Sequence, residues 1–137
     1  MVDDIPADAR RALLIDGNNV IGAAVAGWWR DPPRAVRRLL DRLHCYVEVT
    51  GELVEVVLDV PQPDLPEGNY DGVVVRYATR RGRDAADDRI LELLDADETA
   101  VVEVVTSDRT LAEGARRRGA VVTGAGRFLA RLSDAGC

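Results

Sequence analysis

Apolar and polar positions along the chain follow two patterns, short apolar runs and helical stripes. Runs rich in valine, leucine and isoleucine predict buried strands, near residues 12–16, 53–59, 72–78, 101–106 and 120–123. The stripes between them predict helices, from about 32 to 47, 84 to 95, 111 to 118 and 127 to 132. Strands that alternate with helices are typical of a parallel sheet covered on both faces. The sequence therefore predicts a single α/β domain over 1–137, with 1–9 as a flexible N-terminal tail.

The segment after the second predicted strand is rich in turn formers. Pro61, Pro63 and Pro66 precede Gly68, Asn69 and Asp71. This density of proline excludes a central strand or a helix interior. We expect a loop that lies beside the end of the second strand and forms a wall of any crevice there.

Three of the apolar runs end on an aspartate, at Asp16, Asp59 and Asp108. The carboxyl ends of parallel strands lie along one edge of a sheet, where open α/β folds bind their ligands. Clustered carboxylates repel one another and are costly to desolvate, so they usually imply a divalent cation. The sequence therefore predicts an acidic metal site at this edge.

A fourth acid, Asp87, lies one turn into a predicted helix. At 100° per residue, Ile90, Leu91 and Leu94 fall within about 60° of it, which predicts a position near the centre of the apolar stripe. Asp88 lies at the boundary of that stripe. We expect Asp87 to face the crevice with the three strand-end acids.

Each acid also has a purely structural interpretation. Asp16 and the residues after it are good turn formers, and Asp59 can simply end a strand before a proline loop. Asp87 can interact with the helix dipole, and Asp108 can cap the next helix. What favours a site is that all four would have to fall on one edge by coincidence.

Several segments together resemble the NYN domains of the YacP-like group, within the wider PIN-like nuclease superfamily. The matching segments are residues 14–21, 57–59, 81–90 and 105–109. The resemblance is specific because the helix start at 86–90 (Ala-Asp-Asp-Arg-Ile) occurs together with the strand end at 106–108 (Thr-Ser-Asp). The region from Pro61 to Tyr70 departs from it, being shorter and richer in proline than expected from larger relatives.

The resemblance implies a three-layer, PIN-like α/β/α sandwich with a central, mostly parallel sheet of about five strands. For active members it implies Mg²⁺- or Mn²⁺-dependent cleavage of RNA by an endoribonuclease. Carried over by position, the catalytic acids that bind the metal are Asp16, Asp59, Asp87 and Asp108. Asp88 is a further metal ligand, and Asn19 lies beside the site as a substrate-binding residue.

In the mechanism that we expect, Asp16, Asp87 and Asp108 hold one ion, mostly through water. Asp59 positions a second ion or the attacking water, since paired ions can stabilise both the entering and the leaving oxygen. Hard oxygen ligands suit Mg²⁺ and Mn²⁺ and not zinc.

Candidate RNA-binding residues flank the acids. Arg80, Arg81 and Arg83 precede the Asp87 helix and can bind phosphate bidentately, the alternative being a solvated loop. Ser107 can ligate metal, bind phosphate or cap a helix. Trp28 and Trp29 can stack on bases, but we rather expect one to pack over the core and the other to make a protein contact.

Charge and composition limit the function less than these motifs do. The net charge of −6 argues mildly against nucleic acid, although the arginines are grouped. All 18 basic residues are arginine, which excludes a catalytic lysine. The lone histidine, His44, is expected to pack on a scaffold helix.

The compartment and the partners are expectations too. The acidic start of the chain is unlike a signal peptide and no run is long enough to span a bilayer, so we expect a cytoplasmic protein without a membrane partner. Cys45 and Cys137 show no disulfide framework and are expected to be free thiols. By analogy with PIN-like domains, a homodimer through helices and association with the ribosome are further expectations.

Other classes fit the residues less well. A phosphoacceptor receiver domain needs a lysine partner, and a haloacid-dehalogenase-like phosphatase needs a second aspartate where this chain has Asn18. The stretch Gly124-Ala125-Gly126 does not complete a dinucleotide fingerprint. The serious competitor is a non-catalytic RNA-binding or ribosome-associated module that retains the PIN-like fold.

Overall fold

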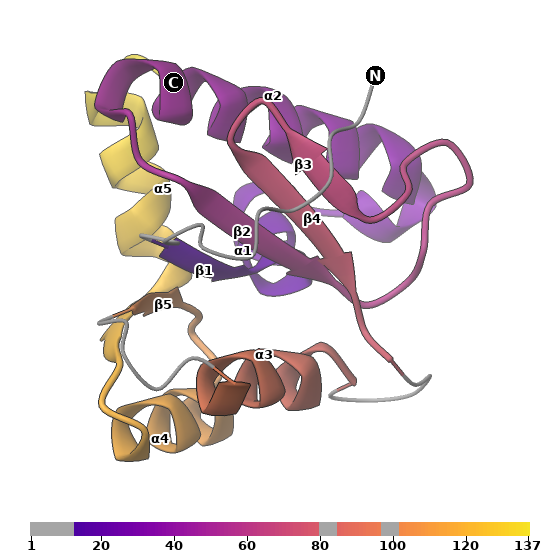
Figure 1. The fold of residues 1–137 in the computed structure, drawn as a ribbon. Coiled ribbons are helices and arrows are strands. Elements are labelled where there is room, and N and C mark those ends of the chain that lie inside the picture. The colour runs from indigo at the N-terminus through magenta and orange to yellow at the C-terminus, as the bar shows by residue number, and fades with distance from the viewer. Residues whose placement is uncertain (1–12, 80–84, 97–101) are drawn as a thin grey trace.

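A computed structural model describes residues 13–79, 85–96 and 102–137 (Figure 1). The strands are β1 (Leu13–Asp16), β2 (Val54–Leu58), β3 (Gly68–Tyr70), β4 (Val73–Tyr77), β5 (Glu103–Val105) and β6 (Val121–Thr123). They form one sheet in the order β3-β4-β2-β1-β5-β6. The expected tail at 1–9 lies outside the described residues.

Every strand pair in this sheet is parallel except one. β1 pairs with β2 and β5, β2 with β4, and β5 with β6, all in parallel, whereas β3 runs antiparallel to β4. The predicted, mostly parallel sheet is confirmed. Because β1 lies in the middle, the ends of β2, β1 and β5 are neighbours, and the acids that follow these strands come from adjacent positions on one edge.

β3 is an addition to the five predicted strands, in a segment expected to be loop. It is an edge strand, where a nearby proline is tolerated because one side of the strand needs no partner. Asp71 (φ 52°) and Gly72 (φ 97°) form a two-residue connection to β4. An Asp-Gly pair is a strong hairpin signal, so the sequence did contain the sign of this strand.

In the part of the chain that the structure describes, five α-helices surround the sheet, and four of them were predicted. They are α1 (Gly17–Ala24), α2 (Pro32–Thr50), α3 (Ala85–Ala96), α4 (Arg109–Arg117) and α5 (Ala125–Asp134). A short 3-10 helix, η1 (Trp28–Arg30), precedes α2. The segment after Asp16, expected to be a tight turn, is α1, which begins directly at the end of β1. No helix in the described ranges has the length and apolarity needed to cross a membrane.

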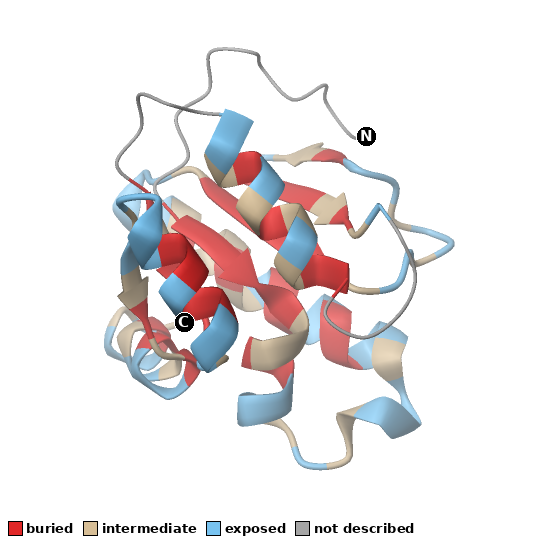
Figure 2. Cartoon of the chain, turned by 90° about the horizontal axis from the view of Figure 1, so that it is seen from below, coloured by how far each residue is buried: buried red, intermediate tan, exposed pale blue. Residues whose placement is uncertain are grey.

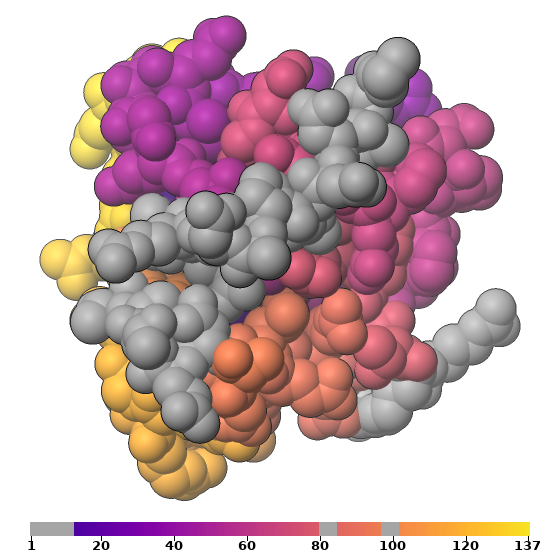
Figure 3. Space-filling model, viewed as in Figure 1, coloured from indigo at the N-terminus to yellow at the C-terminus, as the bar shows by residue number. Residues whose placement is uncertain are grey.

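The helices cover both faces of the sheet. Side chains of α1, α2 and α5 pack with Leu13 and Ile15 into the larger hydrophobic cluster, and those of α3 and α4 pack with Leu14 and Val57 into the smaller one. The central strands β1, β2 and β4 are buried between helices whose outer faces are exposed (Figure 2). In the space-filling view the residues of α2 lie at the top of the molecule and those of α3 and α4 at the bottom (Figure 3). The expected three-layer α/β/α sandwich is confirmed.

α2 is the scaffold helix that its apolar stripe predicts. Its N-terminus is capped by Asp31, whose side chain accepts from the backbone N–H of Arg34 at 3.4 Å, and its C-terminus ends at Gly51 in the left-handed conformation. Nε2 of His44 lies 2.8 Å from the carbonyl oxygen of Tyr70 and forms a hydrogen bond with it. This contact joins α2 to β3 and agrees with the packing role expected for the histidine.

The two cysteines form a disulfide, so the expectation of free thiols was wrong. Sγ of Cys45 on α2 is bonded to Sγ of Cys137, over a sequence separation of 92 residues. The chain end lies on α2 because α5 packs beside that helix, and Nε of Arg42 donates to the carbonyl oxygen of Cys137 at 3.0 Å. Two cysteines give no spacing pattern, and only the tertiary fold brings this pair together.

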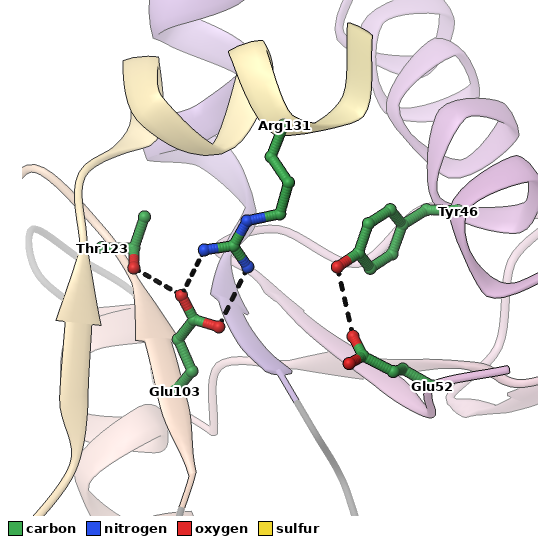
Figure 4. A network of polar contacts seen from close by, with 5 residues as sticks. All are labelled: Tyr46, Glu52, Glu103, Thr123 and Arg131. Carbon is green, nitrogen blue, oxygen red and sulfur yellow. Dashed lines mark hydrogen bonds and ion pairs between the residues drawn. The ribbon is translucent and has the colours of Figure 1, made fainter. Parts of the chain in front are cut away.

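A polar network fastens α5 to the sheet (Figure 4). Arg131 forms a two-pronged ion pair with Glu103 of β5, at 3.0 and 2.7 Å, and its guanidinium carbon lies 5.8 Å from the centre of the Phe128 ring. Thr123 of β6 also donates to Glu103. The hydrogen bonds from Arg131 hold the pKa of Glu103 below its usual range, and we regard the network as structural.

Candidate active site

Asp16 is the innermost of the candidate acids. It ends β1 and stands at the N-cap position of α1, with only 5% of its surface exposed. Its carboxylate makes no capping hydrogen bond of regular geometry with the start of α1, although the backbone N–H of Asn19 is close enough to lower its pKa. A carboxylate that is buried in this way needs compensation from other polar groups or from a cation.

The residue after Asp16 has no room for a side chain. A Cβ on Gly17 would lie 2.6 Å from Cδ2 of Leu58 and 2.9 Å from the carbonyl oxygen of Val57. Such distances are below normal van der Waals contact. Glycine at this position therefore lets the start of α1 lie directly against β2, which keeps Asp16 close to the end of that strand.

Thr106 links Asp16 to the end of β5. Its hydroxyl donates to Oδ2 of Asp16 at 2.9 Å and accepts from the backbone N–H of Asp108 at 3.1 Å. Thr106 is 2% exposed, so this bridge is sheltered from water. One hydroxyl thus connects two of the four candidate acids through hydrogen bonds.

Asn18 and Asn19 join α1 to the neighbouring strand ends on either side. Oδ1 of Asn18 accepts from the backbone N–H of Asp59 at 2.9 Å, and Oδ1 of Asn19 accepts from the backbone N–H of Ser107 at 2.8 Å. The first turn of α1 therefore ties together the loops that follow β2 and β5. Asn19 was predicted to bind substrate, and that role stays a prediction; its side chain contacts the backbone of Ser107.

Two further candidates have structural contacts of their own. Oδ1 of Asp108 accepts from the backbone N–H of Leu111 at 2.8 Å, so Asp108 caps α4, as its alternative interpretation proposed. Oγ of Ser107 accepts from the backbone N–H of Ala125 at 2.9 Å, at the start of α5. A capping carboxylate can still serve a metal through its second oxygen, so the cap leaves the metal role of Asp108 open.

The ionisation of Asp16 is perturbed by this environment. Its pKa is raised from 3.8 to about 6, chiefly by burial and also by the negative charges of Asp59 and Asp108, while the hydrogen bond from Thr106 lowers it. The acids that follow β2 and β5 thus raise the pKa of the carboxylate at the end of β1. Perturbed titration of this kind is frequent at functional sites and marks Asp16 as the electrostatic centre of the cluster.

Asp87 lies on the first turn of α3, half-buried, and Asp88 beside it is exposed. α3 packs on β1 and β2, and the side chains that it buries fully are Ala85, Ala86, Ile90 and Leu93. The buried face of α3 is thus centred on Ala86, Ile90 and Leu93 and not, as predicted, on Ile90, Leu91 and Leu94. Asp87 flanks the buried face rather than standing at its centre, because the small alanines allow the helix to approach the sheet on their side.

Other predicted residues lie outside the part of the chain that the structure describes. These are Arg80, Arg81 and Arg83, which precede α3. Their role in phosphate binding stays a prediction.

The polar atoms near Asp16 are of the type that hard divalent cations prefer as ligands. Within residues 13–79, 85–96 and 102–137, no three side chains of histidine, cysteine, aspartate or glutamate are grouped so that they could hold an ion as they stand. The donors near Asp16 are nevertheless all oxygen atoms, from carboxylates, the Thr106 hydroxyl and the asparagine amides, which is the ligand type of Mg²⁺ and Mn²⁺. A cation would also offset the burial and repulsion that raise the pKa of Asp16.

Two hollows flank the cluster. One, of about 430 Å³, lies on the β5 side and is lined in part by Thr106, Ser107, Arg109 and Arg116. The other, of about 400 Å³, lies on the β2 side and is lined by Asn18, Asp59 and mainly apolar residues. A ligand can therefore approach the strand ends from either side.

Sequence reasoning gave no bridging role to Thr106, Asn18 or Asn19. Polar residues beside strand-end acids were the available signal, but turn formation explained the asparagines equally well. Their partners are 41 to 90 positions away in the chain. Assigning these bridges requires the strand order β2-β1-β5.

Known proteins provide an independent comparison. The family model described as the YacP-like NYN domain matches residues 13–136. In the crystal structure of a mutant of Rae1 (YacP) from Bacillus subtilis, the chain is 26% identical in sequence to this one, with a TM-score of 0.71. The match covers 92% of this chain and 77% of that one. For the crystal structure of Rae1 (YacP) itself the identity is 28% and the TM-score 0.70, over 90% of this chain and 74% of that one. Among curated proteins, none matches the chain.

Proposed function

Because the chain belongs to the YacP-like NYN domain family, which has a nuclease-type fold, we propose that it is a metal-dependent endoribonuclease that hydrolyses phosphodiester bonds of RNA. The observation that carries the proposal is the electrostatic state of Asp16. This buried carboxylate lies under the influence of two neighbouring strand-end acids, and its pKa is raised to about 6. Such an arrangement is costly in the metal-free protein and is relieved by a cation.

In the proposed site Asp16, Asp87 and Asp108 would hold Mg²⁺ or Mn²⁺, with Asp88 beside them, and Asp59 would position a second ion or the attacking water. When bound, the ion supplies Lewis acidity and lowers the pKa of water. Thr106 keeps Asp16 ionised and oriented through its hydrogen bond. Asn18 and Asn19 hold the loops after β2 and β5 in register, which fixes the backbone that carries Asp59 and Asp108.

The chain itself excludes water from the carboxylate of Asp16. Asp16 is nine-tenths buried or more, so its charge acts in a medium of low polarity and is screened little by solvent. The arginines that line the hollow on the β5 side, Arg109 and Arg116, can bind phosphates of the RNA.

One observation favours a second candidate, a non-catalytic RNA-binding module. Asp108 already caps α4, and the described acids are not grouped as a ready-made metal site. In this alternative the acids serve the fold and RNA is bound without being cut.

The two candidates are distinguished by the substitution Asp87→Asn. Labelled single-stranded and structured RNA, with DNA alongside, are incubated with the protein in Mg²⁺, Mn²⁺ or chelator. We expect cleavage of RNA that requires the metal and is lost in the variant, with RNA binding retained, because the substitution removes one ligand charge and leaves the shape of α3 unchanged.

The matched control is Glu92→Gln, which removes one negative charge from an exposed position of the same helix. It should cut RNA as the wild type does. Cleavage that is absent from the wild type under every metal condition, with RNA binding present, would favour the binding module.

A further inference from the structure

An apolar groove beside Asp59 is not used by the proposed chemistry. It has a volume of about 400 Å³ and lies between η1, the start of α2 and the segment after β2. Its lining includes Trp28, Trp29, Pro33, Val60 and Pro61, and also Asp59 and Asn18. Asn18 accepts from the backbone N–H of Asp59, so a hydrogen bond of 2.9 Å fixes this part of the groove to the site.

The two tryptophans are placed differently. Trp28 is half-buried and packs against the larger hydrophobic cluster, whereas Trp29 is 64% exposed. Val60, which also lines the groove, is likewise 64% exposed. Exposed large apolar side chains that gather in one hollow usually mark a binding site. The groove thus combines a fixed aromatic ring with an open one.

Basic residues line the next hollow, on the other side of Trp28. This hollow has a volume of about 240 Å³ and is lined in part by Arg30, Arg34 and Arg38, with Asp31 as the acid among them. Asp31 is engaged as the N-cap of α2. An apolar, aromatic groove thus adjoins a positively charged hollow, and Trp28 lines both.

Aromatic faces next to arginines match the two parts of a nucleotide. Bases stack on aromatic side chains regardless of sequence, and arginines bind the phosphate backbone. A base within a duplex is already stacked on both sides, so only an unpaired base can enter such a groove.

We propose that the Trp28–Trp29 groove is a subsite that holds one unpaired base of the RNA strand next to the scissile phosphate, with a neighbouring phosphate on Arg30, Arg34 and Arg38. The identity of the ligand as RNA rests on the proposed function. Stacking on Trp29 positions the strand so that the phosphate beside the bound base lies toward Asp59. The net negative charge of the chain is then compatible with RNA, because the arginines act locally.

Tryptophan fluorescence tests the proposal directly, because the only two tryptophans of the chain both line the groove. The probe is an unstructured, labelled RNA of about 12 nucleotides, long enough to cover a typical single-strand site. Binding is measured in chelator by anisotropy and by quenching of tryptophan emission. We expect the RNA to quench the emission, and a blunt duplex of the same sequence to leave it unchanged.

Substitutions of Trp29, whose ring is exposed, provide a second test. Trp29→Ala should raise the Kd for the single strand by about 5- to 150-fold, the range that loss of one stacked base gives. Trp29→Phe should restore most of the affinity because it keeps an aromatic face. Val121→Ala, at a 57% exposed position of the edge strand β6, is the control and should bind as the wild type does. Circular dichroism checks that each variant is folded.

The outcomes separate this inference from the proposed function. Metal-dependent cleavage that Trp29→Ala leaves unchanged, without quenching by RNA, overturns the groove proposal and retains the nuclease. Quenching and Trp29-dependent binding without cleavage retain the groove and overturn the nuclease. If Trp29→Ala instead converts a dimer into a monomer in sedimentation, with RNA affinity unchanged, the groove is a protein interface and the proposal is overturned.

Discussion

The hydroxyl of Thr106 donates a hydrogen bond of 2.9 Å to Oδ2 of Asp16, and the two residues are 90 positions apart in the chain. This bond is the direct connection between the end of β5 and the buried acid at the end of β1. It opposes the burial that raises the pKa of Asp16. The pKa of Asp16 therefore depends in part on Thr106, a residue that bears no charge.

Thr106→Val removes this bond and keeps the shape of the side chain. We expect the pKa of Asp16 to rise by a further ~0.5 to 1 unit, the equivalent of one ordinary hydrogen bond. The titration of the carboxyl carbon of Asp16, followed by NMR in chelator, measures this shift. Thr123→Val is the matched control, because Thr123 is also buried and its hydroxyl bonds to Glu103 instead. An unchanged titration in Thr106→Val would contradict the role assigned to the bond.

Asp16 should also make the stability of the metal-free protein depend on pH. Its pKa is about 6 in the folded chain and near 3.8 when unfolded, so the folded chain binds the proton more tightly. The resulting stabilisation is fully present below about pH 4 and is lost as the pH rises through 6. Asp16→Asn, which is neutral throughout, should therefore be more stable than the wild type at pH 8, by up to about 3 kcal/mol, and nearly equal to it at pH 4.

Urea unfolding in chelator at both pH values tests this expectation. The difference between wild type and variant isolates Asp16 from the other titrating groups. Asp134→Asn, at an exposed position of α5, is the control and should show little difference at either pH. A stability difference for Asp16→Asn that is the same at pH 4 and pH 8 would show that burial does not perturb this carboxyl.

Gly17→Ala should destabilise the protein by about 1 to 3 kcal/mol, the usual cost of overpacking. The added Cβ would meet Leu58 at 2.6 Å and the backbone of Val57 at 2.9 Å. Gly126→Ala is the matched control, since it also lies at the start of a helix and a Cβ there has no neighbour within 4 Å. Chemical denaturation of both variants measures the difference. Equal stabilities would mean that α1 can shift away from β2 without cost.

The disulfide between Cys45 and Cys137 should contribute substantially to stability. Its sequence separation of 92 residues corresponds to about 4.6 kcal/mol in the chain-entropy model, with smaller values common in practice. Cys45→Ser and Cys137→Ser should each lower the free energy of unfolding, and reductant should lower that of the wild type to the same level. Reductant should leave both variants unchanged. A wild type that is equally stable with and without reductant would contradict a stabilising bond.

Local patterns in the sequence were sufficient for most of the fold. The apolar runs located β1, β2, β4, β5 and β6, and apolar stripes located four of the helices. α1 was missed because its first turn, Gly17-Asn18-Asn19, consists of poor helix formers. Tertiary contacts override this low propensity, since Val20 and Ile21 of α1 are buried in the larger hydrophobic cluster.

The candidate site, too, could be predicted from the sequence only in part. Strand ends identified Asp16, Asp59 and Asp108 as neighbours on one edge, because parallel strands align their carboxyl ends. The depth of Asp16 and the bridges from Thr106 and the asparagines depend on β1 being the strand between β2 and β5. That order is decided by long-range packing, which a single sequence does not display.

The disulfide divides the oxidised chain into a covalent ring, from Cys45 to Cys137, and a tail that precedes Cys45. Within the described residues the ring contains every strand except β1, which belongs to the tail. In the folded sheet β1 lies between β2 and β5, two strands of the ring. If oxidation precedes the completion of the sheet, the tail must dock between two strands that already belong to a closed ring. In that order of events, the strand that carries Asp16 completes both the sheet and the site.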